Sequence, residues 1–298
     1  YISPAGNTIK ITNDPFGLAI SPNGKISITL HDGVITVIDN DNLKAVRIPE
    51  YNNKSINPLK NGSFIGLAFD TVKNIVYLSG GDAGSVIVFD YINFKVIDSI
   101  SLNGSFNKIK YEDSFTSDLL LLKNELLVLD RGNFRLVRIN TQTKAIIASI
   151  PTGRQPFGLA ISPDKKTVLV ANVGMYDYPL VVGTTLLNYN KQMIPYHPYA
   201  NNTEESINGK IIDGKKIPGL GSPNAPESMS VYSINLDSNK TTAIFKTGML
   251  IGEMIEDAEV VGGASPNSIV IGKKYAYVTN ATNDNISVID YRLGKIIK

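Results

Sequence analysis

The stretch Pro15-Phe16-Gly17-Leu18-Ala19-Ile20-Ser21-Pro22 recurs letter for letter at positions 156–163. An internal repeat of this kind indicates an architecture built from copies of one structural unit. Most residues of such a unit are explained by the scaffold that they build, so the octapeptide says more about fold than about chemistry. Weaker copies of the sequence that follows it recur along the chain and define the unit.

The repeating unit is clearest in its last copy, where four short runs are rich in β-branched and aromatic residues. Gly, Asn, Asp and Lys separate these runs, which predicts four strands joined by tight turns at 265–271, 275–280, 286–290 and 295–297. Earlier copies follow the same order over 17–48, 65–100, 119–150 and 158–247. No segment keeps helical periodicity over a dozen residues, which disfavours an α/β fold. The sequence therefore predicts an all-β protein, a β-propeller with five blades of four antiparallel strands.

The fourth copy is interrupted after its second strand by a long segment from Met175 to Met229 that is rich in Tyr, Pro and Asn. A ring of repeats remains one domain even when the chain is long. We therefore expect a single propeller domain over residues 1–298, with an insertion at 175–229 inside the fourth blade.

The third strand of each unit ends on an acid or an amide, namely Asp39, Asp90, Asn140, Asn235 and Asp290. Asp and Asn form turns by accepting hydrogen bonds from their own backbone a few residues further on. Their regular recurrence argues against a catalytic pair, because catalysis needs one asymmetric site that separates two pKa values. We expect these five residues to be turn formers.

Composition excludes several classes of function. The net charge is +2 with acidic and basic residues interspersed, which gives no electrostatic case for binding nucleic acid or an anionic membrane. No run of some 18 apolar residues is present, so we expect no transmembrane segment. The absence of Cys removes disulfides, thiolate nucleophiles, and zinc or iron–sulfur sites built on thiolates. The chain begins at Tyr1, from which we expect signal removal or shortening at this end.

Residues 277–280 read Tyr-Val-Thr-Asn, the tetrapeptide after which the YVTN-type β-propeller repeat is named, and the surrounding turns resemble that YncE-like family throughout. A narrower resemblance comes from 3–6, 218–228 and 261–267, which are similar to segments of exported bacterial proteins. In those proteins a YncE-like propeller precedes an alkaline-phosphatase-type phosphoesterase module. This resemblance implies an extracytoplasmic location, periplasmic or at the cell surface, and a seven-bladed ring.

Five blades are visible where the resemblance implies seven. A propeller avoids exposed edges only if its last blade meets its first. Either five blades close on themselves, with residues 7–12 as a closing strand, or the chain is part of a seven-bladed ring. We expect the second arrangement.

The phosphoesterase chemistry of the resembling proteins does not transfer to this chain. Such modules bind two metals through Asp and His ligands around a Ser or Thr nucleophile. Only His31 and His197 are present, each apart from clustered carboxylates. We expect no catalytic residue, no metal ligand and no cofactor here, with any phosphoesterase activity in a separate module.

One face of the predicted propeller gathers the candidate binding residues. The turns between second and third strands share it with the connections that lead into each next blade, and the insertion leaves from the same face. Asp130 and Arg131 stand out there, because an Arg at this position can hold a carboxylate or phosphate bidentately. A local ion pair of Arg131 with Asp130 or Asp113 is the interpretation that we favour.

The insertion supplies the remaining candidates, Tyr176, Tyr178, Tyr196, His197 and Tyr199. Long irregular segments in compact domains often carry function, and Tyr suits docking surfaces because it buries a large area at low entropic cost. Three arrangements remain open: the insertion packs on its own propeller, docks another module or subunit, or forms a small-ligand pocket.

The leading hypothesis is a non-catalytic scaffold or protein-interaction module of an exported bacterial protein. It would dock a protein partner or a phosphoesterase module through its insertion-bearing face. One alternative is a propeller enzyme, a lactonase-like hydrolase or a cofactor-dependent oxidoreductase, with a metal or cofactor in the central channel. Another is a structural or adhesive protein of the cell surface.

Overall fold

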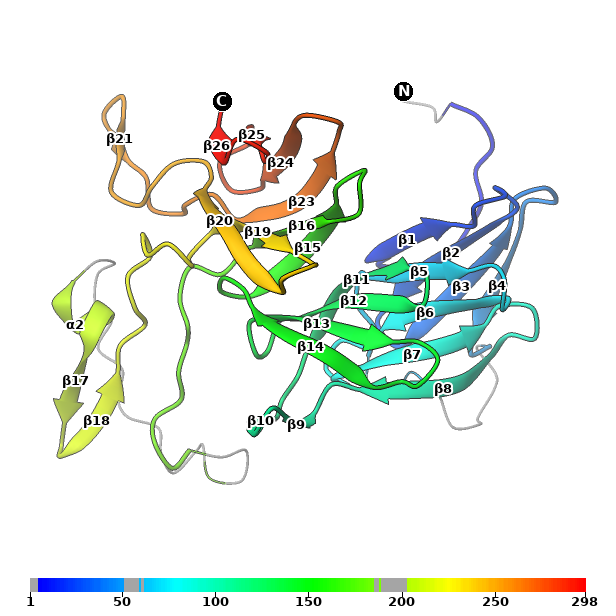
Figure 1. Ribbon diagram of the computed structural model, residues 1–298, viewed down its shortest axis with the longest axis horizontal. Helices are drawn as coiled ribbons and strands as arrows, with labels where there is room; N and C mark the ends of the chain where they lie inside the picture. The colour runs from blue at the N-terminus through cyan, green and yellow to red at the C-terminus, as the bar shows by residue number, and fades with distance from the viewer. Residues whose placement is uncertain (1–4, 51–58, 60–61, 185–187, 189–202) are drawn as a thin grey trace. The chain divides into compact units, whose positions relative to one another are not determined.

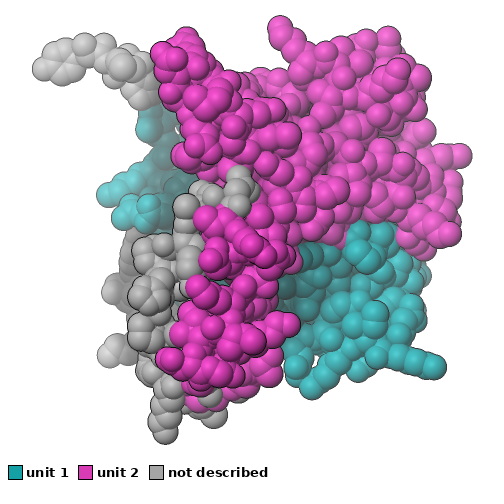
Figure 2. All heavy atoms as spheres, turned by 90° about the vertical axis from the view of Figure 1, so that its left-hand side faces the viewer, with its two compact units in different colours: residues 1–151, 157–159 teal, residues 152–156, 160–298 magenta. Residues whose placement is uncertain are grey.

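The computed structural model describes residues 5–50, 59, 62–184, 188 and 203–298. The chain divides into two units, which Figure 2 colours separately. Unit 1 comprises residues 1–151 and 157–159, and unit 2 comprises 152–156 and 160–298. Each unit has its own sheets and its own apolar core.

Unit 1 contains three sheets of four antiparallel strands, each in simple up-and-down order (Figure 1). The first is β1 (Gly17–Ile20), β2 (Ile26–His31), β3 (Val34–Asp39) and β4 (Lys44–Ile48). The second is β5 (Leu67–Asp70), β6 (Ile75–Ser79), β7 (Ser85–Asp90) and β8 (Lys95–Ser101). The third is β11 (Thr116–Leu122), β12 (Glu125–Asp130), β13 (Arg135–Asn140) and β14 (Ile146–Pro151), preceded by the hairpin of β9 (Gly104–Phe106) and β10 (Ile109–Tyr111).

Unit 2 contains two further four-stranded sheets. One is β15 (Pro156–Ile161), β16 (Thr167–Asn172), β19 (Ser230–Asn235) and β20 (Lys240–Lys246), and residues 157–159 of β15 group with unit 1. The other is β23 (Pro266–Ile271), β24 (Ala276–Asn280), β25 (Asn285–Asp290) and β26 (Lys295–Ile296). A short hairpin, β21 (Met254–Ile255) with β22 (Ala258–Glu259), lies between these sheets in the sequence. The predicted all-β class and its five four-stranded antiparallel sheets are confirmed.

The segment between β16 and β19 carries the insertion, since these two strands pair with each other from Thr167↔Asn235 to Asn172↔Ser230. Its described part forms a helix, α2 (Glu204–Asn208), and a hairpin of β17 (Gly209–Ile212) and β18 (Lys215–Pro218). Thr203 caps α2 by accepting a hydrogen bond from the backbone of Ser206. Asp213 and Gly214, both with positive φ, make the hairpin turn.

The predicted turn formers are confirmed by their hydrogen bonds. Asp39 Oδ1 accepts from the backbone N–H groups of Asp41 and Asn42, both at 3.0 Å. Asp90 repeats the pattern, and both Asp pKa values are lowered, first by a side-chain hydrogen bond from the following Asn. Asn140, Asn235 and Asp290 accept equivalent backbone bonds. These residues build turns, as their recurrence indicates.

The core of unit 1 lies between its sheets. One cluster joins the first sheet to the second through residues buried on facing sides, Ile28, Leu30, Ile35 and Val37 against Val76, Leu78, Ile87 and Phe89. A second cluster joins the second sheet to the third in the same manner. In unit 2 the corresponding cluster packs Leu169, Ala171 and Val231 against Ala276, Val278 and Ile289. Middle strands buried on both faces explain why their sequences are apolar at nearly every position.

The N-terminal segment bears on the alternative in which residues 7–12 close a ring of five blades. Residues 7–12 form no strand in the structure. Thr12 and Asn13 instead make side-chain and backbone contacts to the first sheet through Thr36 and His31. We call residues 5–14 the N-terminal strap.

Candidate functional site

Four phenylalanine side chains of unit 1 form a cluster where the chain enters successive sheets. Phe16 immediately precedes β1, Phe64 lies shortly before β5, Phe115 immediately precedes β11, and Phe157 is the second residue of β15. All four therefore occupy comparable places in the repeating unit, and two of them belong to the duplicated octapeptide. We call Phe16, Phe64, Phe115 and Phe157 the phenylalanine cluster.

Phe64 is the centre of this cluster. Its ring centroid lies 5.0 Å from that of Phe115 and 5.7 Å from that of Phe157, both edge to face, and 6.2 Å from that of Phe16. Edge-to-face rings at these distances attract each other beyond the area they bury. Phe16 remains 48% exposed and the other three rings are half-buried. The cluster therefore presents aromatic surface to solvent.

Glycines next to the cluster allow the first strands of neighbouring sheets to approach each other closely. A Cβ on Gly17 would lie 2.4 Å from the carbonyl oxygen of Ile65, and a Cβ on Gly66 would lie 2.8 Å from the amide nitrogen of Leu119. Neither approach leaves room for a side chain. The Phe-Gly pair in the octapeptide thus has two physical roles, an aromatic contact followed by close backbone packing.

Arg131 adds a positive charge to the phenylalanine cluster. Its guanidinium carbon lies 5.7 Å from the ring centroid of Phe115 and 5.9 Å from that of Phe157, within the range of cation–π attraction. Its backbone N–H donates to the carbonyl of Phe115 at 2.7 Å. Burial lowers the pKa of the Arg131 guanidinium. The predicted candidate Arg131 therefore lies beside aromatic rings that the sequence analysis did not single out.

Asp130 has a structural environment. Its carboxylate is fully buried and pairs with Arg135, whose Nε donates at 2.8 Å and whose side chain is 2% exposed. Ser114 Oγ and the backbone N–H of Phe115 also donate to it, at 2.9 and 3.1 Å. A carboxylate so enclosed holds the turn between β12 and β13 in place. Asp130 therefore supports the phenylalanine cluster through its hydrogen bond with the backbone of Phe115. Its buried carboxylate offers no surface to a ligand.

Arg135 extends this buried network to the β9–β10 hairpin. Its Nη2 donates to the carbonyl of Leu102 at 2.7 Å, and its guanidinium lies 3.4 Å from the ring centroid of Tyr111. Ser149 Oγ donates to the Tyr111 hydroxyl at 3.2 Å. One buried arginine therefore connects the turn at Asp130 with the segment that leads into the third sheet.

Asp118 is a further carboxyl of unit 1 and, unlike Asp130, was not among the predicted candidates. It lies on β11, half-buried, and accepts hydrogen bonds from the backbone of Leu119 at 2.9 Å and of Leu159 at 3.1 Å. Burial raises its pKa to about 6, and the two backbone bonds lower it only in part. Because its bonds are to backbone, we assign this carboxyl a structural role that is sensitive to pH.

We expect stability to depend on the protonation of Asp118. The folded-state pKa lies above the unfolded value of 3.8, so the folded protein binds the extra proton and loses stability as pH rises from about 4 to 7. The loss from this group is on the order of 3 kcal/mol, since one pKa unit corresponds to about 1.4 kcal/mol and the pKa rises from 3.8 to about 6. Chemical denaturation between pH 4 and 7.5 measures it: the free-energy difference between the parent chain and Asp118→Asn should change over this range. An identical pH dependence of the two proteins would contradict the assignment.

Unit 2 carries a charged cluster that holds both ends of the insertion. The Arg154 side chain, 3% exposed, donates through Nη1 to the carbonyls of Met175 at 2.7 Å and Ser222 at 2.8 Å. It also forms ion pairs with Asp177 at 2.8 Å and Glu227 at 3.0 Å. We call this arrangement around Arg154 the insertion clamp.

Lys246 on β20 reinforces the end of the insertion. Its Nζ donates to the carbonyls of Ala225, at 3.1 Å, and Ser228. Burial, followed by the positive charge of Arg154, lowers the pKa of Lys246 to about 8, while Glu227 opposes this shift. Arg154 and Lys246 thus both donate hydrogen bonds to backbone carbonyls at the end of the insertion, just before β19.

The predicted tyrosines of the insertion fall into two groups. Tyr176 is buried, and Tyr178, 58% exposed, packs edge to face against it with ring centroids 5.9 Å apart. Tyr196, His197 and Tyr199 lie outside the described residues. The described part of the chain therefore offers one exposed tyrosine near the start of the insertion.

No three His, Cys, Asp or Glu side chains in the described ranges come together in a way that would hold a metal ion. Among the same residues, no helix has the length and apolarity needed to cross a bilayer.

Comparison with known proteins shows the fold. No protein-family model and no curated protein sequence matches the chain. Solved structures do match. The U3-55K structure matches at 10% sequence identity with a TM-score of 0.58, covering 96% of this chain and 65% of that chain. Kuenenia stuttgartiensis hydrazine synthase matches at 15% identity with a TM-score of 0.51, covering 97% of this chain and 80% of that chain. A chain of the mitotic checkpoint complex matches at 8% identity with a TM-score of 0.53, covering 91% of this chain and 61% of that chain.

These neighbours have β-propeller folds, and the chain spans less than two thirds of the length of the U3-55K and checkpoint chains. At such identities the likeness concerns the fold alone. Together with the four-stranded sheets it shows an all-β protein of the propeller class, which the repeat predicts.

Proposed function

We propose that this chain is a propeller scaffold that binds a protein partner through the phenylalanine cluster and Arg131. The observation that carries the proposal is the gathering of four aromatic rings and one guanidinium, only half-buried, in unit 1. Aromatic residues and Arg are the types most enriched at the centres of protein interfaces. The four rings come from separate places in the sequence, each in or close to the first strand of a sheet.

The chemistry of the cluster selects the kind of partner. Half-exposed rings favour an apolar or aromatic side chain of the partner, which completes their burial. Arg131, with its pKa lowered by burial, gains from a carboxylate next to that side chain. A partner segment that places an apolar residue beside an acidic one fits this surface.

The finer features of the proposal come from the sequence resemblance. They are a YVTN-type propeller, an exported location, and a phosphoesterase module as the docked partner. Tyr178, exposed at the start of the insertion, is the second contact that we propose for that partner. The insertion clamp supports this role because it fixes the backbone on which Tyr178 stands.

We expect Phe16→Ala and Phe64→Ala each to weaken partner binding by at least tenfold, because truncation of a central aromatic contact commonly costs more than 1 kcal/mol. A photo-crosslinking phenylalanine analogue at position 16 identifies the partner, and calorimetric titration with the purified partner then measures the affinity of each variant.

Phe94 provides the matched control, since this phenylalanine is 42% exposed in the turn after β7 and lies outside the cluster. Phe94→Ala should leave the affinity within a factor of two. Equal affinities of the Phe16→Ala, Phe64→Ala and Phe94→Ala proteins would refute the proposed surface.

A further inference from the structure

One face of the first sheet of unit 1 packs in the core, and the other face is mixed. Beside the apolar Val34 and Ile38, this second face carries the polar Thr29, His31 and Thr36, all at most 4% exposed. Buried hydroxyl and imidazole groups are costly unless they form hydrogen bonds. The N-terminal strap covers this second face and supplies such bonds.

His31 fastens the strap. Its Nδ1 lies 2.7 Å from the carbonyl oxygen of Asn13, and because a carbonyl only accepts, Nδ1 carries a proton. Its Nε2 lies 2.7 Å from the Thr29 hydroxyl and 3.1 Å from that of Thr36. Thr36 in turn donates to the Thr12 hydroxyl at 3.3 Å. Thr12 keeps its own hydroxyl proton for another acceptor.

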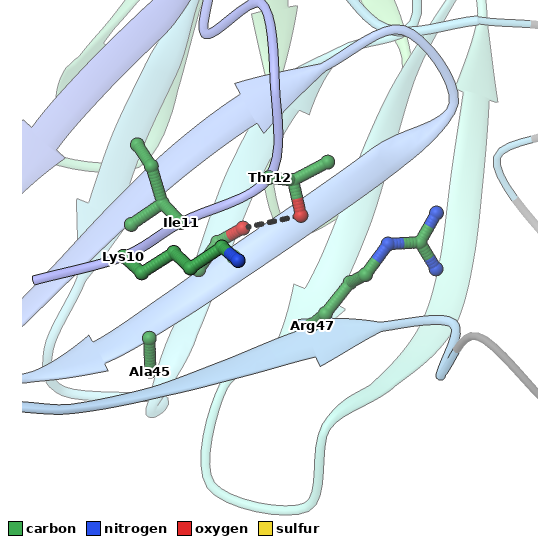
Figure 3. A pocket seen from close by; sticks show the side chains of 6 residues that line it. Lys10, Ile11, Thr12, Ala45 and Arg47 are labelled. Carbon is green, nitrogen blue, oxygen red and sulfur yellow. Dashed lines mark hydrogen bonds between the residues drawn. The ribbon is translucent and has the colours of Figure 1, made fainter.

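A cavity of about 480 Å³ lies between the strap and the sheet. Lys10, Ile11 and Thr12 line it from the strap, and Thr36, Ala45 and Arg47 line it from β3 and β4. Thr36 and Arg47 are directly opposite each other in the strand pair, so their side chains share the face beneath the strap. Figure 3 shows the Lys10, Thr12 and Arg47 side chains, and its dashed line marks the hydrogen bond that Thr12 accepts from Thr36.

The described residues that line the cavity combine two cations, two hydroxyls and two apolar side chains, and none of these described residues is an acid. Two positive side chains that line one small volume give it a positive potential, which favours an anion over a neutral or cationic ligand. An anion there also receives charge-assisted hydrogen bonds from both cations, which are stronger than neutral ones. Ile11 and Ala45 provide a patch for an apolar group attached to that anion.

We propose that this cavity binds a small organic anion, a carboxylate or a phosphate monoester that bears an apolar group. The charged end lies between Lys10 and Arg47 and accepts a hydrogen bond from Thr12, and the apolar end contacts Ile11 and Ala45. This site is separate from the phenylalanine cluster, and its test is independent of the proposed partner.

Titration of the ¹⁵N-labelled chain with benzoate, phenyl phosphate and neutral benzamide tests the proposal. We expect saturable shifts of the backbone amides of Lys10, Thr12, Thr36 and Arg47 with at least one of the two anions. Benzamide should bind about tenfold more weakly, because it lacks the charge. Either anion behaving in this way supports the proposal, and the tighter one identifies the head group.

Lys10→Met and Lys44→Met form a matched pair of variants. Lys44 is an exposed lysine of β4 whose side chain points to the other side of the strand from Ala45. We expect Lys10→Met to raise the dissociation constant about tenfold and Lys44→Met to change it less than twofold. Thermal unfolding of both variants confirms that each is folded.

Three results would overturn the proposal: no saturable shift with either anion, equal affinity for benzamide, or unchanged affinity in the Lys10→Met protein. Arg47→Met is the confirmatory variant. It is interpreted beside Lys10→Met because Arg47 also donates to the carbonyl of Pro49.

Discussion

Replacing Asp130 by alanine is expected to lower the free energy of unfolding by about 3–5 kcal/mol, the usual cost of leaving one member of a buried ion pair without its partner. Arg135 would remain in a site where it is 2% exposed, and Ser114 and the backbone of Phe115 would lose their acceptor. Urea denaturation followed by circular dichroism measures the change.

A double variant separates the buried charge from simple loss of packing. In Asp130→Ala/Arg135→Met both charges are absent, and apolar replacements of buried pairs are often neutral or stabilising. We expect the double variant to recover most of the stability lost in the single one. A single variant that loses less than 1 kcal/mol, or a double variant no more stable than the single, would contradict the buried network.

Replacing Arg154 by methionine is expected to release both ends of the insertion from unit 2. The carbonyls of Met175 and Ser222 would each lose the hydrogen bond that Arg154 donates, and Asp177 and Glu227 would lose a cation. Hydrogen exchange of the backbone amides at 174–177 and 220–229 should accelerate at least tenfold, a loss of about 1.4 kcal/mol of local stability. The pKa of Lys246 should rise from about 8, because the charge of Arg154 contributes to lowering it.

Arg292→Met is the control for this variant, since Arg292 is an exposed arginine of unit 2 that donates to the carbonyl of Lys273. Its exchange rates at 174–177 and 220–229 should equal those of the parent chain. Unchanged exchange in the Arg154→Met protein would show that the clamp does not hold the insertion.

The repeat predicts the sheets well because its signals are local. Strand runs, turn residues such as Asp39 and Asp90, and the Phe-Gly pair of the octapeptide each act within a few residues. The phenylalanine cluster was not predicted, since its contacts join Phe64 with residues 48 to 93 positions away in the sequence. Only the recurrence of Phe before Gly in the octapeptide hinted at a shared place for these rings.

The sequence did not predict the buried contacts of Arg135 and Arg154. Arg135 stands at the start of a strand where an exposed arginine is the ordinary expectation, yet it is buried on Asp130 and Tyr111. Arg154 meets partners 21, 68 and 73 positions away, a separation that no local pattern reveals. Such contacts are set by the packing of whole sheets.

The strap shows how a strand-like sequence is diverted. Residues 7–12 are rich in the β-branched residues Ile and Thr, which are common in strands, and a ring of five blades would use this segment as its closing strand. The buried His31 ring and Thr36 hydroxyl need hydrogen-bond acceptors, and the segment supplies them through the Asn13 carbonyl and the Thr12 hydroxyl. Hydrogen bonds to the first sheet therefore outweigh the strand propensity of residues 7–12.

The central claim, that the phenylalanine cluster is the partner-binding surface, is tested most directly by hydrogen exchange of the chain alone and with its crosslinked partner bound. The predicted result is slower exchange at the backbone amides of Phe16, Phe64, Phe115 and Arg131 when the partner is bound. The exchange rate of the Phe94 amide should not change. Protection centred on the turn at Phe94, with the cluster unchanged, would contradict it.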